Sequence, residues 1–238
     1  MRIRTLASGS GGNAYLLTSE DGATLLLEAG IRFKDLQRAL RFKLSSLDGV
    51  LCSHEHADHA KALPHLMKAG VDCYATNGTL QALGLKGHRA KVITPLEPID
   101  IGLWRVLAFP AVHDAVEPVG FVIANASTKL LYLTDSAYCP YRFDGLTHLM
   151  IETNFSMEIL QRNLEAGRLP AAHMARVIRN HLSLERALGL LKANDLSRVE
   201  RITLLHMSNS NADEASFCDA VRRATGIPTY TAAERATA

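Results

Sequence analysis

The histidine-rich segment Ser53–His59 constrains this chain more than any other feature of its sequence. It reads Ser-His-Glu-His-Ala-Asp-His and directly follows a predicted buried strand at 48–53. In an extended chain, residues two apart point to the same side, so His54 and His56 can share one metal ion. When the chain then turns into a helix, Asp58 and His59 swing toward a neighbouring point. One short loop can therefore serve two adjacent ions, and imidazole and carboxylate suit zinc and similar divalent metals.

Three further residues of ligand type stand where predicted buried strands end. His113 follows an apolar strand, Asp135 follows the strand Leu-Leu-Tyr-Leu-Thr, and His206 follows Arg-Ile-Thr-Leu-Leu. Each of them alone would more often be a turn or core residue. Together with the histidine-rich segment they are sufficient to complete the ligand shells of two ions.

The order of the predicted elements indicates one α/β domain covering residues 1–238. Strands are expected at Arg2–Ala7, Asn13–Thr18, Ala23–Glu28, Leu130–Thr134, Leu149–Glu152 and Arg201–Leu205, and short strands are expected over most of 71–134. Helices are expected at Phe33–Leu40, Ala60–Ala69, Ser156–Ala166, Leu184–Ala193 (capped by Ser183) and Ala212–Ala224 (capped by Asn211). This order favours two packed sheets with helices outside, and the residues after Thr231 are expected to fray.

Composition and charge exclude several classes of protein. No run approaches the roughly 18 apolar residues of a membrane span, and the first residues lack the apolar stretch of a signal peptide, so a cytoplasmic protein is expected. Four isolated cysteines, at 52, 73, 139 and 218, form no Cys-x-x-Cys pair and indicate buried thiols in a reducing compartment. The net charge of +2 permits a polyanionic substrate without indicating one.

The pattern His-x-His-x-Asp-His, followed by a distant His, Asp and His, resembles the metallo-β-lactamase superfamily over nearly the whole chain. The resemblance implies a four-layer αβ/βα sandwich that holds two divalent ions, zinc in the first place and Mn²⁺ as the alternative. It implies that a hydroxide between the ions is the nucleophile, with Asp58 orienting it. It assigns His54, His56 and His113 to one ion, Asp58, His59 and His206 to the other, and Asp135 to a bridging position.

Two segments resemble those of the tRNA 3′-processing endonucleases. Glu152 lies in Ile-Glu-Thr-Asn-Phe and His181 lies in Asn-His-Leu-Ser. The resemblance implies that His181, oriented by Glu152, donates a proton to the leaving oxygen. The second metal site has no thiolate ligand, which favours phosphoester chemistry over β-lactam hydrolysis. His56 stands where the oxygen-reducing di-iron branch is expected to carry a carboxylate, which favours hydrolysis over redox chemistry.

The segments Leu-Ala-Ser-Gly-Ser-Gly-Gly-Asn, Thr-Asp-Ser and His-Met-Ser-Asn-Ser-Asn resemble the YycJ/WalJ-type proteins. That resemblance implies a small nuclease or phosphodiesterase, an exonuclease on DNA in some members. Phosphate contacts are expected from four residues: Ser8, Ser10, Asn13 and Asn209.

The chain departs from the family pattern at two places. Glu28-Ala29-Gly30 stands where Asp-x-Gly is usual, and Asn180 stands where Gly is usual. These departures concern the support of the site rather than its ligands. The remaining histidines that we considered, at 65, 88, 148 and 173, are expected to have ordinary surface or core roles.

The leading hypothesis is a phosphodiesterase acting on DNA or RNA, most simply an exonuclease-like nuclease. A small-molecule hydrolase, such as a cyclic phosphodiesterase or a thioesterase, is the second hypothesis, and the modest charge favours it. A non-catalytic binding module is the third, and the intact ligand set argues against it. The sequence leaves open the physiological substrate, the native metal, the strand polarity and the oligomeric state.

Overall fold

The computed structural model describes residues 1–232, which divide into two compact units. Unit 1 contains residues Met1–Pro110 and Ala115–Ser127, and unit 2 contains Ala111–Asp114 and Thr128–Ala232. Organisation as a single domain over 1–238 stays a prediction. The expected fraying after Thr231 falls outside the described residues, apart from Ala232.

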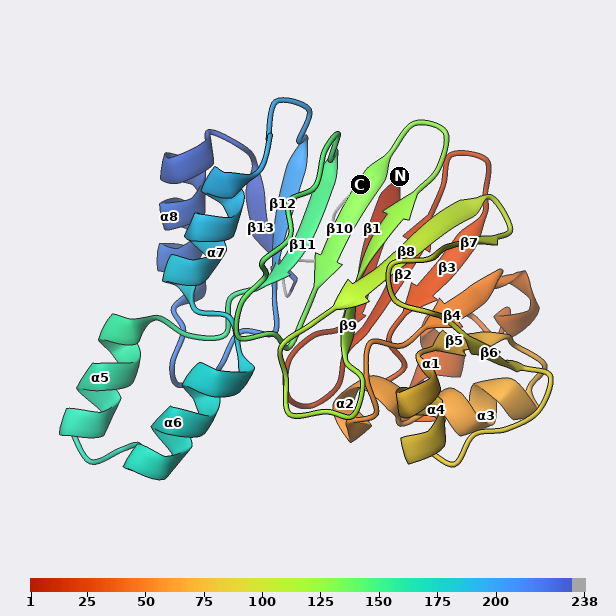
Figure 1. The fold of residues 1–238 in the computed structure, drawn as a ribbon, viewed down its shortest axis with the longest axis horizontal. Coiled ribbons are helices and arrows are strands. Elements are labelled where there is room, and N and C mark those ends of the chain that lie inside the picture. Colours follow the sequence, from red (N-terminus) through yellow and green to blue (C-terminus); the bar gives the residue numbers. More distant parts are fainter. Residues whose placement is uncertain (233–238) are drawn as a thin grey trace. The chain divides into compact units, whose positions relative to one another are not determined.

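Unit 1 contains a six-stranded sheet in the order β1-β2-β3-β4-β5-β6 (Figure 1). The pairs β1–β2 and β2–β3 are antiparallel, and β3 to β6 run parallel to one another. Unit 1 also contains three further strands, β7 to β9, paired antiparallel in sequence order. The bounds are β1 Arg2–Ala7, β2 Ala14–Thr18, β3 Thr24–Leu27, β4 Gly49–Leu51, β5 Cys73–Ala75, β6 Ala90–Val92, β7 Pro98–Ile101, β8 Trp104–Pro110 and β9 Val119–Ala124. The strands predicted within the first 53 residues are therefore confirmed, with β4 shorter than expected.

The helices of unit 1 differ from the prediction at two places. The helix expected at Ala60–Ala69 is two helices, α2 (Ala57–Ala60) and α3 (Leu63–Lys68). The break has a tertiary cause, since the amide of Ala62 donates to the carbonyl oxygen of Ala29 at 2.8 Å instead of to a helical partner. Helix α4 (Asn77–Ala82) was not expected, because Gly78 weakens the helical pattern, but the side chain of Thr76 caps it. The remaining elements, α1 (Phe33–Ala39) and the short 3₁₀ helix η1 (Leu44–Ser46), complete unit 1.

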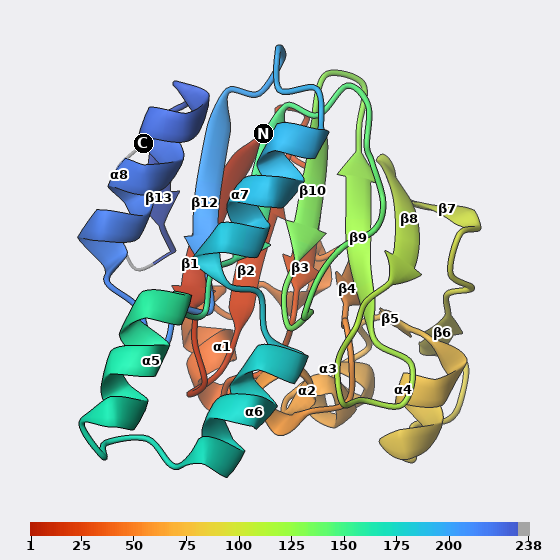
Figure 2. The ribbon, with the colours of Figure 1, turned by 60° about the vertical axis from the view of Figure 1, so that its left-hand side comes forward.

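Unit 2 contains four parallel strands, β10 (Lys129–Leu133), β11 (His148–Glu152), β12 (Arg201–Leu205) and β13 (Thr229–Thr231). Helices α7 (Leu184–Ala193) and α8 (Glu214–Thr225) lie side by side along these strands (Figures 1 and 2). The cap of α7 by Ser183 is confirmed. The predicted cap of α8 is wrong: Asp213 accepts from the amide of Ser216, while the side chain of Asn211 accepts from Asn163.

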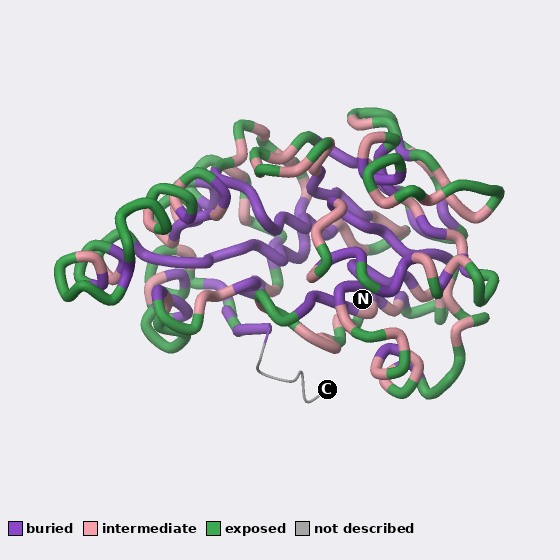
Figure 3. Tube along the Cα trace, turned by 90° about the horizontal axis from the view of Figure 1, so that it is seen from below, coloured by how far each residue is buried: buried purple, intermediate pink, exposed green. Residues whose placement is uncertain are grey.

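Two more helices of unit 2 pack against each other around a small apolar cluster. They are α5 (Met157–Glu165) and α6 (Ala171–Asn180), and the cluster includes Phe155, Leu160 and Val177. Figure 3 shows that burial follows the strands, whereas the outer turns of the helices are exposed. No helix among residues 1–232 combines the length and the apolar character needed to cross a bilayer.

The parallel strands of unit 2 fix where polar residues meet. Leu133 of β10 lies beside Ile151 of β11, and Glu152 lies beside Leu205 of β12. Because the carboxyl ends of adjacent parallel strands meet at one edge of a sheet, residues that follow these strands gather there. The sequence pattern predicts Asp135, Glu152 and His206 at these ends.

Candidate metal centre

In unit 1 the predicted ligands of the histidine-rich segment converge. Nε2 of His54 lies 3.2 Å from Nδ1 of His56, and the rings of His54 and His59 are 4.2 Å apart between centroids. Nε2 of His59 lies 3.5 Å from a carboxylate oxygen of Asp58. The helical turn that begins at Ala57 places His59 beside His54 and Asp58 beside His59.

Two buried residues hold His59 in place. The amide nitrogen of the Asn13 side chain lies 3.1 Å from Nε2 of His59, and Oε2 of Glu28 lies 3.6 Å from its Nδ1. The side-chain oxygen of Asn13 accepts from Gly9 and Tyr15, which identifies the atom facing His59 as the amide donor. Nε2 therefore presents its lone pair, and Nδ1 presents its hydrogen to Glu28.

Gly30 lets the residues that follow β3 lie directly against the histidine-rich segment. A Cβ atom at this position would overlap the carbonyl group of Asp58. Three backbone hydrogen bonds of 2.7–2.9 Å close this contact: Asn13 to Asp58, Ala29 to His59 and Gly30 to Asn13. The glycine of the Glu28-Ala29-Gly30 sequence is therefore required by a close approach of two backbones.

In unit 2, Asp135 and His206 leave their strands in the left-handed conformation. Their φ angles are 43° and 49°, in a region that is strained for residues other than glycine. The turn redirects each side chain toward the other, so that Nδ1 of His206 lies 3.1 Å from Oδ1 of Asp135. Both side chains are almost fully buried, at 5% and 3% exposure.

His113 is held as a neutral imidazole. Its Nδ1 lies 2.9 Å from the carbonyl oxygen of Asn180, which can only accept, so Nδ1 carries the hydrogen. Nε2 then presents its lone pair, 3.6 Å from Oδ2 of Asp135. Burial lowers the pKa of His113 below its ordinary value, although the charge of Asp135 opposes this. A neutral imidazole with a fixed tautomer is the form that binds a metal.

The predicted acid pair, Glu152 and His181, is joined directly. Nδ1 of His181 lies 2.7 Å from Oε1 of Glu152, and Oε2 of Glu152 accepts from the amides of Ser136 and Leu182. Burial lowers the pKa of His181, but the charge of Glu152 and hydrogen bonds to Asp135 and Glu152 outweigh it and raise the pKa to about 10. Burial alone would raise the pKa of Glu152, but the charge of His181 lowers it.

The donor sets of both units fit divalent metal ions. Within unit 2, one ligand atom from each of Asp135, Glu152, His181 and His206 lies within 4.8 Å of the others. Within unit 1, nitrogen atoms of His54 and His56 face each other at hydrogen-bond distance, with the carboxylate of Asp58 beside His59. Converging imidazole nitrogens and carboxylates without a thiolate match the ligands of zinc and of manganese.

The four residues expected to contact phosphate lie in different settings. Asn13 is fully buried, and its side-chain amide donates to the backbone oxygen of Gly9 and faces Nε2 of His59. Ser8 and Ser10 are exposed in the loop that Asn13 holds, and Asn209 is exposed after β12. The structure therefore gives Asn13 a supporting position, and the phosphate contacts stay predictions.

Sequence reasoning did not assign a role to two buried residues around the site. Glu28 supports His59, and Asn154 donates its side-chain amide to the backbone oxygen of His206 at 2.8 Å. Glu28 directly follows β3, and Asn154 lies two residues after β11, as Asp135 does after β10, and this shared position was the available signal. Burial raises the pKa of Cys139, which lies four residues after Asp135. A reactive cysteine instead has a lowered pKa, so Cys139 does not have the character of a nucleophile.

Comparisons with known proteins identify the family of this chain. The family described as Beta-lactamase superfamily domain matches residues 23–207. The chain is 32% identical over 222 residues to exodeoxyribonuclease WalJ of Streptococcus pneumoniae, covering 87% of this chain and 81% of that protein. It is 27% identical over 226 residues to exodeoxyribonuclease YycJ of Bacillus anthracis, covering 89% and 84%.

Solved structures show the same fold. The metallo-β-lactamase fold protein YhfI from Bacillus subtilis superposes with a TM-score of 0.72 at 16% identity, covering 96% of this chain and 95% of that one. The short form of human tRNase Z superposes with a TM-score of 0.61 at 17% identity, covering 88% and 93%. The predicted α/β fold class and the resemblance are confirmed. The chain belongs to the β-lactamase superfamily, and it is a metal-dependent hydrolase with the metallo-β-lactamase fold.

Proposed function

We propose that this enzyme hydrolyses phosphodiester bonds of nucleic acid, as an exonuclease. The pair of Glu152 and His181 beside Asp135 is the observation that carries this function. Cleavage of a phosphodiester expels an alkoxide, which needs a proton, whereas a thiolate leaving group needs one much less. The exodeoxyribonuclease names of the two relatives support the same substrate class.

Two divalent ions, most simply Zn²⁺ with Mn²⁺ as the alternative, are part of the proposal. The superfamily pattern assigns them to the predicted ligands His54, His56, Asp58, His59, His113, Asp135 and His206. When bound, such ions lower the pKa of water and neutralise charge on a phosphoryl group. The neutral tautomer of His113 and the paired nitrogens of His54 and His56 support this assignment.

His181 supplies the proton in this proposal. Its Nδ1 is held by Glu152, so the hydrogen on Nε2 is the one available to the leaving oxygen. The side chain of His181 is 21% exposed, whereas His113 and His206 are 3% and 5% exposed. His181 can therefore meet a substrate, and the charge of Glu152 keeps it protonated at neutral pH. The carboxylate of Asp58 is proposed to orient the attacking water.

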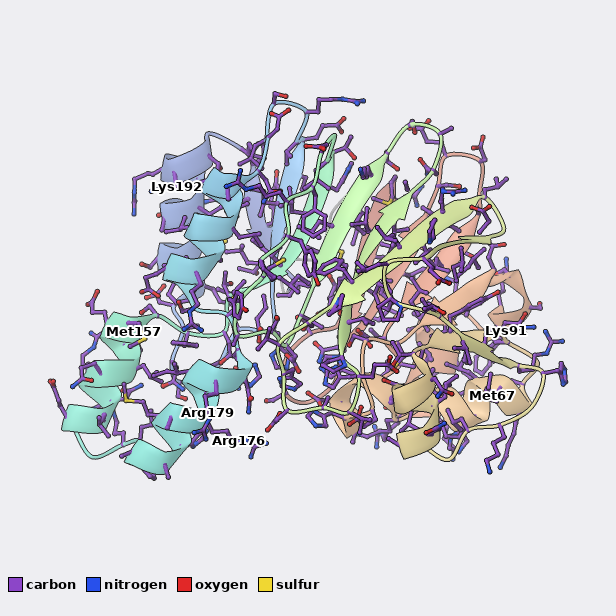
Figure 4. All side chains as sticks on the ribbon, viewed as in Figure 1. Met67, Lys91, Met157, Arg176, Arg179 and Lys192 are labelled. Carbon is purple, nitrogen blue, oxygen red and sulfur yellow. The ribbon has the colours of Figure 1, made fainter. Side chains whose placement is uncertain are left out.

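Helix α6 favours a polyanionic substrate. It carries Arg176 and Arg179 on its exposed surface and contains no acidic residue (Figure 4). The helix ends at Asn180, so its last turn leads directly into His181. Cationic side chains beside the proton donor suit a substrate with several phosphates.

A substrate panel tests the proposal. Metal-loaded enzyme is incubated with single-stranded DNA, duplex DNA, RNA, a bis-nitrophenyl phosphodiester, a thioester and a β-lactam, with Asp58→Ala as the control. We expect turnover of the phosphodiesters, release of nucleotides from nucleic-acid ends, and loss of both in the control. Turnover of the thioester or the β-lactam alone would contradict the proposal.

A small-molecule phosphodiesterase is the second candidate, because the net charge of the chain is only +2. Salt separates the two candidates, since each phosphate that a nucleic-acid enzyme neutralises steepens the log–log salt slope of binding by about 0.7–0.9. A flat salt response with turnover of cyclic or mononucleotide diesters would favour the small-molecule enzyme.

A cytoplasmic location is part of the proposal and is supported by four free cysteines, three of them buried.

A further inference from the structure

Unit 1 contains a pocket formed by α1 and α3 that the proposed chemistry does not use. Its volume is about 540 Å³, within the range of roughly 300–1,000 Å³ found for ligand pockets. Four cationic side chains line it: Arg32, Lys34, Arg38 and Lys61. Among the described residues that line it, only Asp35 has a carboxylate.

The charge of the pocket is not neutralised internally. Asp35 pairs with Arg32 at 2.6 Å and lies 3.8 Å from Arg38, so one carboxylate is shared by two guanidinium groups. Lys34 and Lys61 are exposed, and neither forms an ion pair within the described part of the chain. The pocket therefore carries excess positive charge that is available to an anion.

The pocket also has an aromatic wall. The rings of Phe33 and His65 stack with centroids 5.4 Å apart and planes inclined by 23°. Phe33 packs against the core of unit 1, as does Met67, two residues after His65 in α3, whereas His65 is exposed. The core thus anchors one ring, and the other ring is presented toward a ligand.

The pocket borders the histidine-rich segment. The chain is still helical at Lys61, whose amide donates to the carbonyl oxygen of Ala57. Asp58 and Lys61 are three residues apart, so they lie on the same face of this turn. On the other side, Gly30 touches the backbone of Asp58 and leads directly into Arg32. Both pocket walls therefore begin beside Asp58.

We propose that this pocket binds an unpaired nucleotide of the substrate strand, with its phosphates on the four cationic side chains and its base stacked on His65. The proposal rests on the function proposed above. Positive charge combined with an exposed aromatic ring is the pattern by which proteins bind single-stranded nucleic acid. A base within a duplex is already stacked on its neighbours, so the pocket selects an unpaired end.

The phosphate contacts are tested by binding across a range of salt concentrations. The probe is a phosphorothioate oligodeoxythymidine carrying a fluorescent label, which resists cleavage by the metal-loaded enzyme. We expect Lys34→Gln/Lys61→Gln to flatten the log–log salt slope by about 0.7 for each lost phosphate contact. The matched control, Lys68→Gln/Lys86→Gln, removes two exposed lysines of unit 1 outside the pocket and should keep the wild-type slope.

The stacking contact is tested with 2-aminopurine, a base whose fluorescence falls when it stacks. His65→Ala should remove the quenching and weaken binding roughly 5- to 150-fold, the range measured for one base on an aromatic side chain. His88→Ala, which removes an exposed histidine of unit 1 outside the pocket, should change neither. A blunt duplex should compete poorly with the single strand.

The outcomes separate this proposal from the proposed function. If the pocket variants bind with the same salt slope and affinity as their controls, the proposed nucleotide binding by the pocket is wrong, even if the enzyme degrades DNA. If the wild-type enzyme binds the strand through these residues but cleaves no phosphodiester, the pocket proposal is supported and the proposed nuclease function is refuted. If the wild-type enzyme does not bind the strand at all, both proposals fall.

Discussion

Replacing Gly30 by alanine should damage the fold and the metal site together. The added Cβ would overlap the carbonyl group of Asp58 and come within 2.8 Å of the amide nitrogen of Asn13. Both obstacles are backbone atoms, which cannot rotate away. The residues that follow β3 and the histidine-rich segment must therefore separate. Their three connecting hydrogen bonds, from the amides of Asn13, Ala29 and Gly30, would lengthen or break.

The magnitude follows from these bonds. A buried polar group left without its partner costs about 2 kcal/mol, so two or three disrupted bonds cost about 4–6 kcal/mol. In a protein of this size 1 kcal/mol lowers the melting temperature by about 2–4 °C, which gives a loss of roughly 8–24 °C. Because Asp58 and His59 move with the backbone, the Gly30→Ala enzyme should also retain less metal.

Differential scanning calorimetry in chelator and metal analysis after zinc loading measure the two effects. Gly11→Ala is the matched control, because a Cβ at Gly11 meets nothing within 4 Å. A melting temperature of Gly30→Ala within a few degrees of that control, with a full metal complement, would refute the reasoning.

Three further variants or conditions test the site. His181→Ala should keep the metal and slow cleavage by roughly 10²–10⁴-fold, and the loss should shrink for a nitrophenyl leaving group; an equal loss on good and poor leaving groups would indicate a positional role. Glu28→Gln should weaken metal binding by roughly 10–100-fold through His59, as measured by competition with a chelator; unchanged affinity would exclude this support. In metal-free protein, the raised pKa of His181, about 10, stabilises the fold fully below its unfolded value of about 6.5, and this stability is lost as the pH rises through 10. Urea unfolding should therefore show His181→Gln less stable than wild type at pH 6.5, by an amount on the order of 4 kcal/mol that vanishes above pH 10.

Several predicted site residues, ligands and Glu152 alike, could be read from the sequence because strands order them. Asp135, Glu152 and His206 each end or follow a parallel strand, and parallel strands deliver their ends to one edge. The segment from His54 to His59 concentrates its ligands locally, where the change from extended chain to helix decides their direction. Neither inference needed contacts between residues far apart in the sequence.

Apart from α4, which a local cap by Thr76 supports, the features that the sequence did not reveal depend on such distant contacts. The break between α2 and α3 follows from the bond of Ala62 to Ala29, and the cap of α8 is Asp213 because Asn211 is engaged by Asn163. The role of Glu28 depends on His59, which is 31 positions away in the sequence. Local helix propensity does not show which of two similar polar residues already forms a hydrogen bond with a distant part of the chain.

His113 and His181 illustrate how the fold gives one residue type two chemical roles. Their rings lie 5.7 Å apart in unit 2, and each is held through Nδ1. The partner of His113 is the carbonyl oxygen of Asn180, which accepts a hydrogen bond without carrying a full charge, and burial lowers the pKa of His113. The partner of His181 is the carboxylate of Glu152, whose charge raises the pKa of His181 against the same burial. The first arrangement suits the proposed neutral metal ligand and the second suits the proposed proton donor, so the accepting group, rather than the histidine, determines the protonation state at each position.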